Sequence, residues 1–228
     1  MKIAGSTVLV TGANRGLGAR LTEQLLDRGA SVYAAARNPD TITFPGVTPV
    51  RLDITDPASV AAAARDLTDV TFLVNNAGSS TGAALVGGDL ADIELEMRTH
   101  YFGTLAMIRG FAPHLAANGG GAILNVLSVL SWIAFPASGA YCAAKSAEWA
   151  LTNAVRQELA PRGTQVTALH VGYMDTDMTS GLDVAKVDPA GIARIALDGI
   201  EAGDAEILAD DVSRQVRAGL AGGVAALY

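Results

Sequence analysis

The sequence predicts one α/β domain in which helices cover both faces of a parallel, doubly wound sheet. Short apolar runs alternate with longer segments of helical periodicity, which is the pattern of strand–helix–strand units. The chain has 228 residues, of which 50% are hydrophobic and 17% charged, enough for one substantial core. A glycine loop between the first apolar run and the first helical segment is the third observation. No interdomain linker or repeat divides residues 1–228, so we expect a single domain.

Seven apolar runs bounded by turn residues predict the strands. They are Thr7–Val10, Ser31–Ala35, Thr48–Leu52, Phe72–Val74, Ala122–Leu127, Val166–Val171 and Glu206–Leu208. The segment from Leu115 to Ala144 contains no charged residue, but glycine, asparagine and proline interrupt it. We therefore expect a strand covered on both faces there rather than a membrane span.

Five longer segments place apolar residues at helical spacing. They are Leu17–Arg28, Pro57–Leu67, Leu90–Ala117, Ser138–Leu159 and Pro189–Ala202. Gly103 is a candidate break in the third segment, and a weak final helix is expected after Asp210. The connection from Ala36 to Val47 contains prolines and a glycine and is too short for a crossover helix.

Composition and charge argue against several classes of function. The formal net charge of -7 disfavours a nucleic-acid or anionic membrane partner, because both reward clustered Lys and Arg. Cys142 is the only cysteine, so no intramolecular disulfide forms, and the first residues lack the build of a signal peptide; we expect a cytoplasmic protein. The separated histidines and the single cysteine give no metal-ligand spacing, so we expect no metal.

The first predicted strand leads through Thr11-Gly12-Ala13-Asn14-Arg15-Gly16-Leu17-Gly18 into an amphipathic helix. Glycines allow a tight turn and a close approach of the backbone to a pyrophosphate, and the N-terminus of the helix attracts its negative charge. The context therefore predicts a dinucleotide site with the spacing G-x-x-x-G-x-G. An ordinary glycine turn is the alternative.

The residue after the second predicted strand indicates which dinucleotide binds. An NAD site usually has an acidic residue there, about 20 positions beyond the glycines, to accept hydrogen bonds from the ribose hydroxyls. This chain has Arg37 instead, and an arginine can hold a 2′-phosphate with help from Arg15 in the glycine loop. We therefore expect NADP(H) in preference to NAD(H), with a merely solvated Arg37 as the alternative.

A hydroxyl, a phenol and an ammonium follow the fifth predicted strand at a spacing suited to proton transfer at a carbonyl. Ser128 ends that strand, and Tyr141 and Lys145 share one face of the next helix because positions i and i+4 are neighbours. The ammonium is expected to lower the pKa of the phenol from its ordinary value of about 10. Ser128 would donate to the same substrate oxygen as charge develops there. Alone, however, a Tyr-x-x-x-Lys pair is more often an ordinary surface pair.

Four motifs occur in order along nearly the whole chain: the glycine loop, Asn75-Asn76-Ala77-Gly78, Ser128 and Tyr141-Cys142-Ala143-Ala144-Lys145. With them the chain resembles the classical short-chain dehydrogenase/reductase family. The resemblance implies a Rossmann-type domain and an oxidoreductase that transfers a hydride between a nicotinamide and a carbonyl or alcohol carbon. It makes Tyr141 the acid/base and Ser128 the partner of the substrate oxygen. Lys145 would modulate Tyr141 and bind the nicotinamide ribose.

The resemblance also implies which residues bind the cofactor. Asp53 and Ile54 are similar to a pair that contacts the adenine, and Thr176 is similar to a threonine that meets the carboxamide. The full expected set is Gly12, Asn14, Arg15, Gly16, Leu17, Gly18, Arg37, Asp53, Ile54, Asn75, Ala77, Gly78, Tyr141, Lys145, Gly172 and Thr176.

Two positions depart from the family pattern. His100 stands where the family commonly has the asparagine of a catalytic tetrad. An imidazole can hold a water chain to Lys145, and a packed helix histidine is the alternative. Val171 replaces the proline that usually precedes Gly172. These departures leave open a second function, an NADP(H)-binding sensor or scaffold protein without turnover.

The segment after Ser128, from Val129 to Pro136, is apolar, and Tyr173 and Met174 are expected to face it across a cleft. A hydrophobic ketone or alcohol is therefore the expected substrate. Packing within the loop is the alternative use of these residues.

The run Gly78-Ser79-Ser80-Thr81-Gly82 satisfies the serine-hydrolase pattern G-x-S-x-G. We interpret it as a coincidence, because a nucleophile elbow needs a helix directly after its serine and none is predicted here. The helices Leu90–Ala117 and Ser138–Leu159 have charge-poor outer faces, which favours a homodimer or homotetramer.

Overall fold

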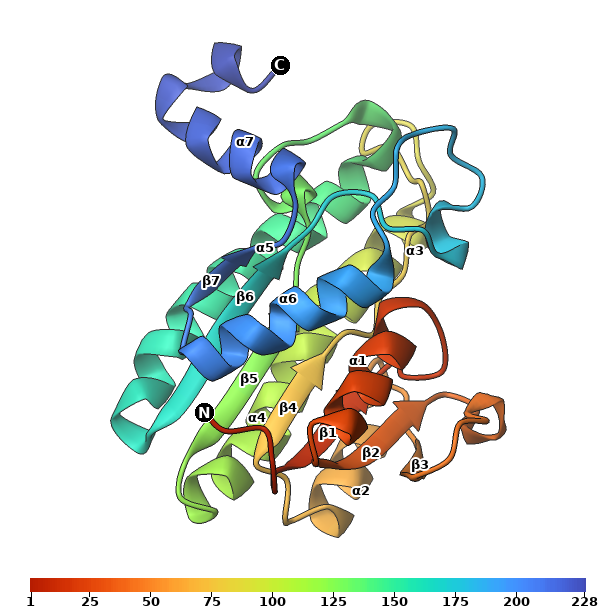
Figure 1. The fold of residues 1–228 in the computed structure, drawn as a ribbon. Coiled ribbons are helices and arrows are strands. Elements are labelled where there is room, and N and C mark those ends of the chain that lie inside the picture. Colours follow the sequence, from red (N-terminus) through yellow and green to blue (C-terminus); the bar gives the residue numbers. More distant parts are fainter.

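A parallel sheet of seven strands lies between two layers of helices in the computed structural model, which describes residues 1–228 (Figure 1). The strands are β1 (Thr7–Thr11), β2 (Ser31–Ala36), β3 (Val47–Arg51), β4 (Phe72–Asn75), β5 (Gly121–Val126), β6 (Thr164–His170) and β7 (Glu206–Leu208). Their order is β3-β2-β1-β4-β5-β6-β7, and every neighbouring pair is parallel. The predicted fold class and all seven predicted strands are confirmed, with each strand end within two residues of its expected position.

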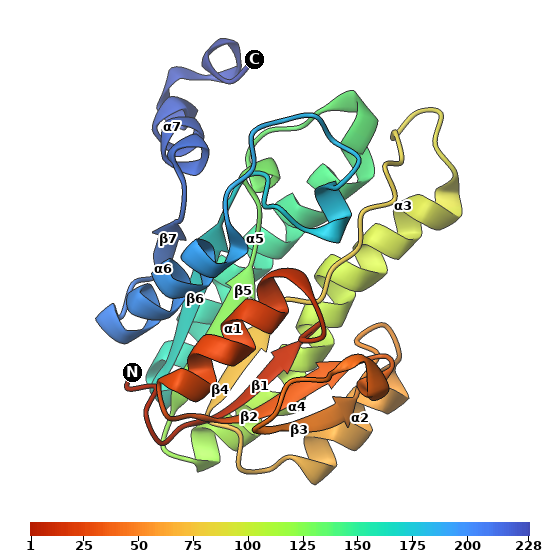
Figure 2. The same cartoon turned by 45° about the vertical axis from the view of Figure 1, so that its right-hand side comes forward.

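The helices are α1 (Gly16–Asp27), α2 (Pro57–Asp66), α3 (Leu90–Glu96), α4 (Thr104–Ala117), α5 (Gly139–Leu159), α6 (Pro189–Ala202) and α7 (Asp211–Gly219). Helices cover both faces of the sheet, whereas α7 lies beyond the end of β7 (Figures 1 and 2). Successive strand residues alternate between the layers: Val8 and Val10 pack toward α1 and α6, whereas Leu9 packs toward α2, α4 and α5. Only the short 3-10 helix Pro39–Thr41 interrupts the β2–β3 connection, so no crossover helix lies there, as predicted. None of the helices combines the length and the apolar character that a membrane crossing requires.

The helix predicted over residues 90–117 is continuous, and the expected break at Gly103 is wrong. α3 runs into a π-helical segment, Met97–Gly103, which runs directly into α4. Gly103 keeps helical dihedral angles and allows close packing, because a Cβ there would lie 3.0 Å from the Ile54 Cδ1 atom. π-Helical segments occur frequently at functional sites, and this one carries His100.

The strand order reverses at β1, and this reversal places the candidate site. β2 and β3 lie on one side of β1, while β4 to β7 lie on the other. At such a switch point the loops that follow β1 and β4 diverge and leave a crevice at the carboxyl edge of the sheet. The connections after β4, β5 and β6 gather at that same edge (Figure 2).

We predict that Gly18→Ala lowers the free energy of unfolding by about 2–3 kcal/mol, the upper range for overpacking. The new Cβ would lie 2.2 Å from the Gly12 carbonyl oxygen and 2.5 Å from the Asn76 side-chain nitrogen. Urea denaturation provides the measurement. Gly191→Ala in α6 is the matched control, since its Cβ meets no atom within 4 Å and alanine favours a helix. Equal stability of the two variants would contradict the packing argument.

Candidate active site

The glycine loop after β1 packs too closely for side chains at three of its positions. Gly12 and Gly16 have φ angles of +64° and +54°, which favour glycine. Gly18 lies against the carbonyl of Gly12, as described above. Leu17 is buried in the core, and Asn14 is half-buried, so the backbone forms much of the surface of this loop.

Thr11 and Asn76 join the glycine loop to the segment that follows β4. The Thr11 hydroxyl accepts hydrogen bonds from the N–H groups of Asn76 (2.9 Å) and Ala77 (3.0 Å) and donates to the Val74 carbonyl (3.1 Å). The Asn76 side chain donates to the carbonyls of Thr11 (2.9 Å) and Gly12 (3.2 Å). Neither residue was predicted from the sequence as part of the site, although the Asn-Asn-Ala-Gly motif marked the position of Asn76.

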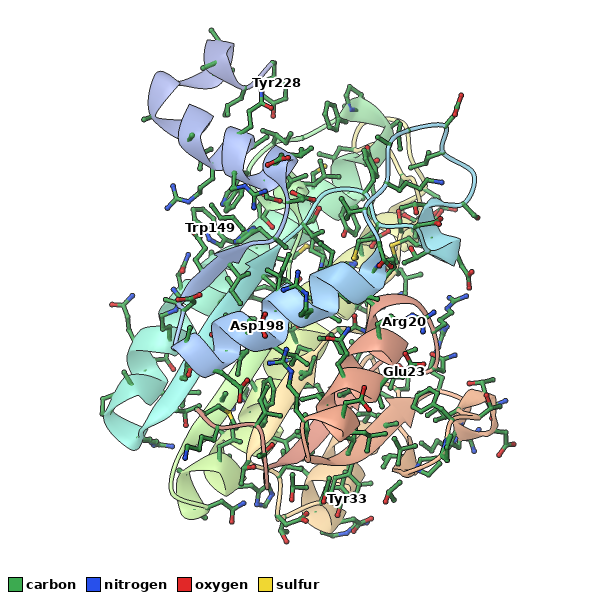
Figure 3. All side chains as sticks on the ribbon, in the orientation of Figure 1. Arg20, Glu23, Tyr33, Trp149, Asp198 and Tyr228 are labelled. Carbon is green, nitrogen blue, oxygen red and sulfur yellow. The ribbon has the colours of Figure 1, made fainter.

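The N-terminus of α1 offers free N–H groups to an anion. No side chain caps it, and its first turn contains no acidic residue. A cavity of about 420 Å³ opens beside it, lined in part by Gly16 and Thr176. Arg20 and Glu23, paired at 2.8 Å, form the neighbouring part of the wall and lie side by side in Figure 3. The structure brings Gly16 and Thr176 together, since the Thr176 methyl carbon is 3.3 Å from the point that a Gly16 Cβ would occupy.

The two arginines expected to hold a 2′-phosphate are both exposed. Arg37 directly follows β2 and takes part in none of the ion pairs of the structure. Arg15 pairs instead with Asp177, at 3.1 Å, in the loop after β6. Exposed ion pairs contribute only about 0–1 kcal/mol, so Arg15 can exchange Asp177 for another anion at small cost.

Asp53 and Ile54 follow β3 at the same edge of the sheet. One oxygen of Asp53 accepts hydrogen bonds from the backbone N–H and the hydroxyl of Thr55, at 2.9 and 2.7 Å. Ile54 is buried against Gly103 of the π-helical segment. The pair therefore connects the β3 loop to the helix that carries His100.

Asn75 and Gly172 lie at the carboxyl ends of β4 and β6. The Asn75 side chain donates to the Asn125 oxygen at 2.8 Å, and its own oxygen is buried without a partner. The N–H of Gly172 donates to the Asp210 carboxylate at 2.6 Å, and the preceding Val171 carbonyl accepts from the Val129 N–H at 3.0 Å. The Asp210 contact is a restraint on the Gly172 loop that the sequence did not predict.

Ser128, Tyr141 and Lys145 come together at this edge. The Lys145 Nζ atom lies 5.8 Å from the centroid of the Tyr141 ring, and the Ser128 hydroxyl is close enough to the phenol to lower its pKa. Lys145 is only 5% exposed, and its ammonium donates to the Val126 carbonyl at 2.8 Å. The end of β5 and the first turns of α5 therefore position a hydroxyl, a phenol and an ammonium in one cluster.

Glu148 is a second charged residue in the cluster and was missed in the sequence. It lies one turn after Lys145 on α5 and is 2% exposed. One carboxylate oxygen accepts from the Lys145 ammonium at 2.7 Å, and the other accepts from the Thr104 hydroxyl at 2.9 Å. Although burial disfavours the ammonium, the carboxylate of Glu148 raises the pKa of Lys145. The signal in the sequence was a glutamate three positions after the lysine, on the same helix face.

His100 is buried between two carboxylates, those of Glu96 and Glu148. Its Nε2 atom lies 3.0 Å from the Ser79 carbonyl and 3.2 Å from Glu96, while its Nδ1 atom faces Glu148 at 3.9 Å without a hydrogen-bond partner. The ring stands edge-on to Tyr141 with 5.1 Å between centroids. His100 therefore packs in the helix interior, and it also belongs to the polar cluster around Tyr141.

Glu96 ties the loop after β4 to the π-helical segment. It is fully buried and accepts hydrogen bonds from the Thr81 N–H and the Ser79 hydroxyl, and its Oε2 atom lies 3.2 Å from the His100 Nε2 atom. Burial alone would raise the pKa of this carboxyl, but these three partners lower it to about 2. Glu96 was also missed in the sequence. Ser80, the serine of the G-x-S-x-G pattern, lies exposed in this loop with no helix directly after it.

The pKa of Tyr141 lies above its ordinary value, although Lys145 itself acts in the expected direction and lowers it. Burial of the phenol is the largest influence and raises the pKa above its ordinary value. Lys145 and the Ser128 hydroxyl favour the phenolate, but the carboxylates of Glu148 and Glu96 oppose it. The net direction is upward because burial and the two carboxylates outweigh the ammonium and the hydroxyl. The sequence motif shows the ammonium but none of these opposing influences.

The apolar segment after Ser128 mostly packs inward, which corrects the expectation that all of it forms a substrate wall. Val129, Leu130 and Ile133 are buried in a small core with Cys142 of α5. Phe135, by contrast, is 44% exposed. Tyr173 (40%) and Met178 (52%) in the loop after β6 are exposed, as is Leu85 (55%) in the loop after β4. Exposed apolar side chains thus come from all three loops at this edge.

His170 of β6 contacts the backbone of Ser128. Its Nδ1 atom lies 3.2 Å from the Ser128 carbonyl, and since a carbonyl only accepts, Nδ1 carries the hydrogen. The ring stacks on Trp132 with 3.8 Å between centroids, and Trp149, labelled in Figure 3, meets Trp132 edge-on. Burial is the main cause that lowers the pKa of His170 to about 4.

The residues at this edge fit a nicotinamide dinucleotide. The glycine loop leaves its backbone accessible where Cβ atoms would collide, and the adjacent helix N-terminus is uncapped. The buried oxygen of Asn75 lacks a partner, and Arg37 is exposed and unpaired. These groups supply the anion-binding N–H donors, the acceptor and the cation that such a ligand requires.

Three comparisons with known proteins agree with this geometry. The sequence profile of the short chain dehydrogenases matches residues 6–186. The NADPH-dependent 1-acyldihydroxyacetone phosphate reductase of Schizosaccharomyces pombe is 34% identical over 182 residues, which cover 76% of this chain and 61% of the reductase. Gluconate 5-dehydrogenase of Gluconobacter oxydans is 32% identical over 194 residues, covering 79% and 75% of the two chains. The chain thus matches only about three fifths of the first of these relatives.

Among solved structures, a short chain dehydrogenase of Burkholderia cenocepacia J2315 in complex with NADP superposes with a TM-score of 0.95. It is 39% identical and covers 100% of this chain and 97% of its own. The named relatives act on different substrates, an acyldihydroxyacetone phosphate in one case and gluconate in the other. Their likeness to this chain therefore leaves its substrate open.

We predict that His170 makes the protein less stable in acid. Its pKa is about 4 in the folded state and about 6.5 in an unfolded chain, so the unfolded state binds a proton first as the pH falls. The contribution is fully present above about pH 6.5 and is lost toward pH 4, with a total near 3 kcal/mol. Urea titrations of the wild type and of His170→Asn across this range provide the measurement. The same pH dependence in both proteins would contradict the assignment.

Proposed function

The chain belongs to the short chain dehydrogenase family, and we propose that it is an NADP(H)-dependent oxidoreductase acting on an apolar ketone or alcohol. The observation that carries the proposal is the cluster of Ser128, Tyr141 and Lys145 beside the glycine loop, at the carboxyl edge of the sheet. A protein that only binds a dinucleotide needs the glycine loop but not this cluster. The non-catalytic sensor therefore remains the second candidate.

The three residues divide the work of proton transfer. The bound nicotinamide supplies or accepts the hydride. Tyr141 gives a proton to the carbonyl oxygen in reduction and takes it back in oxidation. The Ser128 hydroxyl accepts a hydrogen bond from the Leu130 N–H at 3.1 Å, which fixes its position. It donates to the substrate oxygen as negative charge develops there. Lys145, held by the Val126 carbonyl, places a positive charge beside the phenol and would bind the nicotinamide ribose.

NADP(H) is the proposed cofactor because a cation, rather than a carboxylate, follows β2. Arg37 is exposed and unpaired, and Arg15 is held only by an exposed contact with Asp177. The NADP complex of the Burkholderia cenocepacia relative and the NADPH dependence of the Schizosaccharomyces pombe reductase support the same choice. An aspartate or glutamate after β2 would instead repel a 2′-phosphate.

An apolar substrate is proposed because the loops after β4, β5 and β6 expose Leu85, Phe135, Tyr173 and Met178 at the edge that carries Tyr141. Small-molecule sites are lined mainly by such side chains, with few polar groups. We also propose a homo-oligomer. Phe102, 57% exposed, and the adjoining apolar groove between α2 and α4 support it.

Tyr141→Phe is expected to lower kcat/KM for carbonyl reduction about 10²–10⁴-fold, the usual contribution of a general acid. Its dissociation constant for NADPH should change little, because the phenylalanine keeps the ring. NADPH absorbance with a panel of apolar ketones, together with a fluorescence binding titration, provides both measurements. Turnover at the parent rate would refute the catalytic role. Tight NADPH binding by the wild type with no oxidation against the panel would favour the sensor.

Arg37→Ala should raise the dissociation constant for NADPH by about 10–100-fold, since a charge-assisted hydrogen bond is worth about 1.5–3 kcal/mol. Binding of NADH, which lacks the 2′-phosphate, should stay unchanged. Arg65→Ala is the matched control, because Arg65 is an exposed arginine on α2 that pairs only with its neighbour Asp66. Equal loss of NADPH and NADH affinity in Arg37→Ala would show that Arg37 does not recognise the phosphate.

A further inference from the structure

We propose that the segment after β7, from α7 to Tyr228, is a clamp on the loop between Ser128 and Tyr141, and that Arg217 and Tyr228 are its positioning residues. The inference rests on the proposed function, because it gives these two residues a part in shaping the substrate pocket. It deepens that function because neither residue belongs to the cluster of Ser128, Tyr141 and Lys145.

Tyr228 holds the backbone of this loop directly. Its hydroxyl oxygen accepts a hydrogen bond from the Ala134 N–H at 2.7 Å, although the two residues are 94 positions apart in the chain. The residue after Ala134 is Phe135, which is 44% exposed and is one of the apolar side chains at the edge that carries Tyr141. A restraint on Ala134 is therefore a restraint on the backbone that places Phe135.

Arg217 of α7 holds the ring of Trp132, two residues before Ala134. Its guanidinium carbon lies 5.8 Å from the centroid of the Trp132 ring, which is within the range of a cation–π contact. Arg217 is itself fixed by Glu206 of β7, whose oxygen accepts from the Arg217 Nε atom at 2.9 Å. His170 of β6 stacks on the same ring. The Trp132 ring is thus held by β6 and α7 together.

Apolar contacts join the clamp to the small core on which Tyr141 packs. This core consists of Val129, Leu130, Ile133 and Cys142. Val216 and Leu227 of the clamp pack against it, and so do Trp132 and Tyr141. The loop continues through the 3-10 helix Pro136–Ser138 directly into α5. The clamp and the first turns of α5 therefore share one support.

The polar contacts of the two positioning residues separate the clamp from the cofactor side of the crevice. Tyr228 bonds to Ala134 and Arg217 to Glu206, and neither partner belongs to the glycine loop or to the residues expected to bind the cofactor. Loss of either contact should therefore change the choice among ketones with little change in the dissociation constant for NADPH. A merely structural role would lower stability without changing that choice.

The first experiment measures the clamp without a substrate. Tyr228→Phe removes the acceptor of the Ala134 N–H, and amide hydrogen exchange followed by NMR reports on that N–H. Its exchange should become about 2–10-fold faster, which corresponds to the loss of one ordinary hydrogen bond. Tyr33→Phe is the matched control, because it removes a hydroxyl that contacts Asp69 at 3.2 Å, at the opposite end of the molecule (Figure 3). Unchanged exchange at Ala134 in Tyr228→Phe would overturn the proposal.

The second experiment tests the effect of the clamp on the pocket. NADPH oxidation is followed with aliphatic methyl ketones of increasing chain length. In Tyr228→Phe and in Arg217→Met, the ratio of kcat/KM between the most and the least favoured ketone should fall by about 3–10-fold, since a loosened apolar wall discriminates less between chain lengths. The change should lie mainly in KM. Arg194→Met is the matched control, because the Arg194 guanidinium pairs with Asp198 on α6, at 3.4 Å.

The outcomes distinguish the clamp from the proposed function. Faster exchange at Ala134 with an unchanged ratio among the ketones would overturn the role of the clamp in the pocket, and so would an equal fall of the ratio in Arg194→Met. Absence of NADPH oxidation by the wild type would instead contradict the proposed function. The exchange measurement needs no turnover, so the contact between Tyr228 and the loop is tested in either case.

Discussion

The buried ammonium of Lys145 is the constraint on which the rest of the site depends. An uncompensated cation in the interior would cost several kcal/mol, so the surrounding elements have to supply acceptors. β5 supplies the Val126 carbonyl, and α5 supplies Glu148, which is held in turn by Thr104 of α4. His100 connects this group to Glu96. Compensation of one charge thus fixes how α4, the π-helical segment and α5 pack at the carboxyl edge of the sheet.

The cofactor side of the crevice depends on backbone packing rather than on buried charge. Thr11 and Asn76 join the loops on either side of the point where the strand order reverses. Gly18 lets α1 approach the glycine loop so closely that its free N–H groups reach the surface of the crevice. The cofactor side and the charged cluster respond differently to pH. A hydrogen-bonded backbone junction has no pH dependence of its own, whereas the charged cluster does. Cofactor binding and proton transfer can therefore be separated by mutation.

The sequence allowed prediction of the sheet and of the polar groups at its carboxyl edge. It did not allow prediction of the two buried carboxylates beside them. Apolar runs such as Ala122–Leu127 mark strands because both faces of a parallel strand are buried. Glu96 and Glu148 carried no comparable signal, because a glutamate three or four positions from a cation on a helix is usually a solvated surface pair. Their burial arises only when the π-helical segment packs on α5, a contact between residues far apart in the chain. The inward packing of Trp132 depends in the same way on its stack with His170.

The upward net shift in the pKa of Tyr141 was not foreseen for the same reason. A Tyr-x-x-x-Lys motif specifies the distance between a phenol and an ammonium along one helix, and from that distance alone the phenolate is favoured. The free energy of ionisation depends instead on every charge near the phenol and on its loss of water. Here Glu148 lies closer to the ammonium, at 2.7 Å, than the ammonium lies to the ring centroid, at 5.8 Å. The same four-residue spacing can therefore accompany a lowered or a raised phenol pKa, depending on burial and on whether the lysine already has an anionic partner.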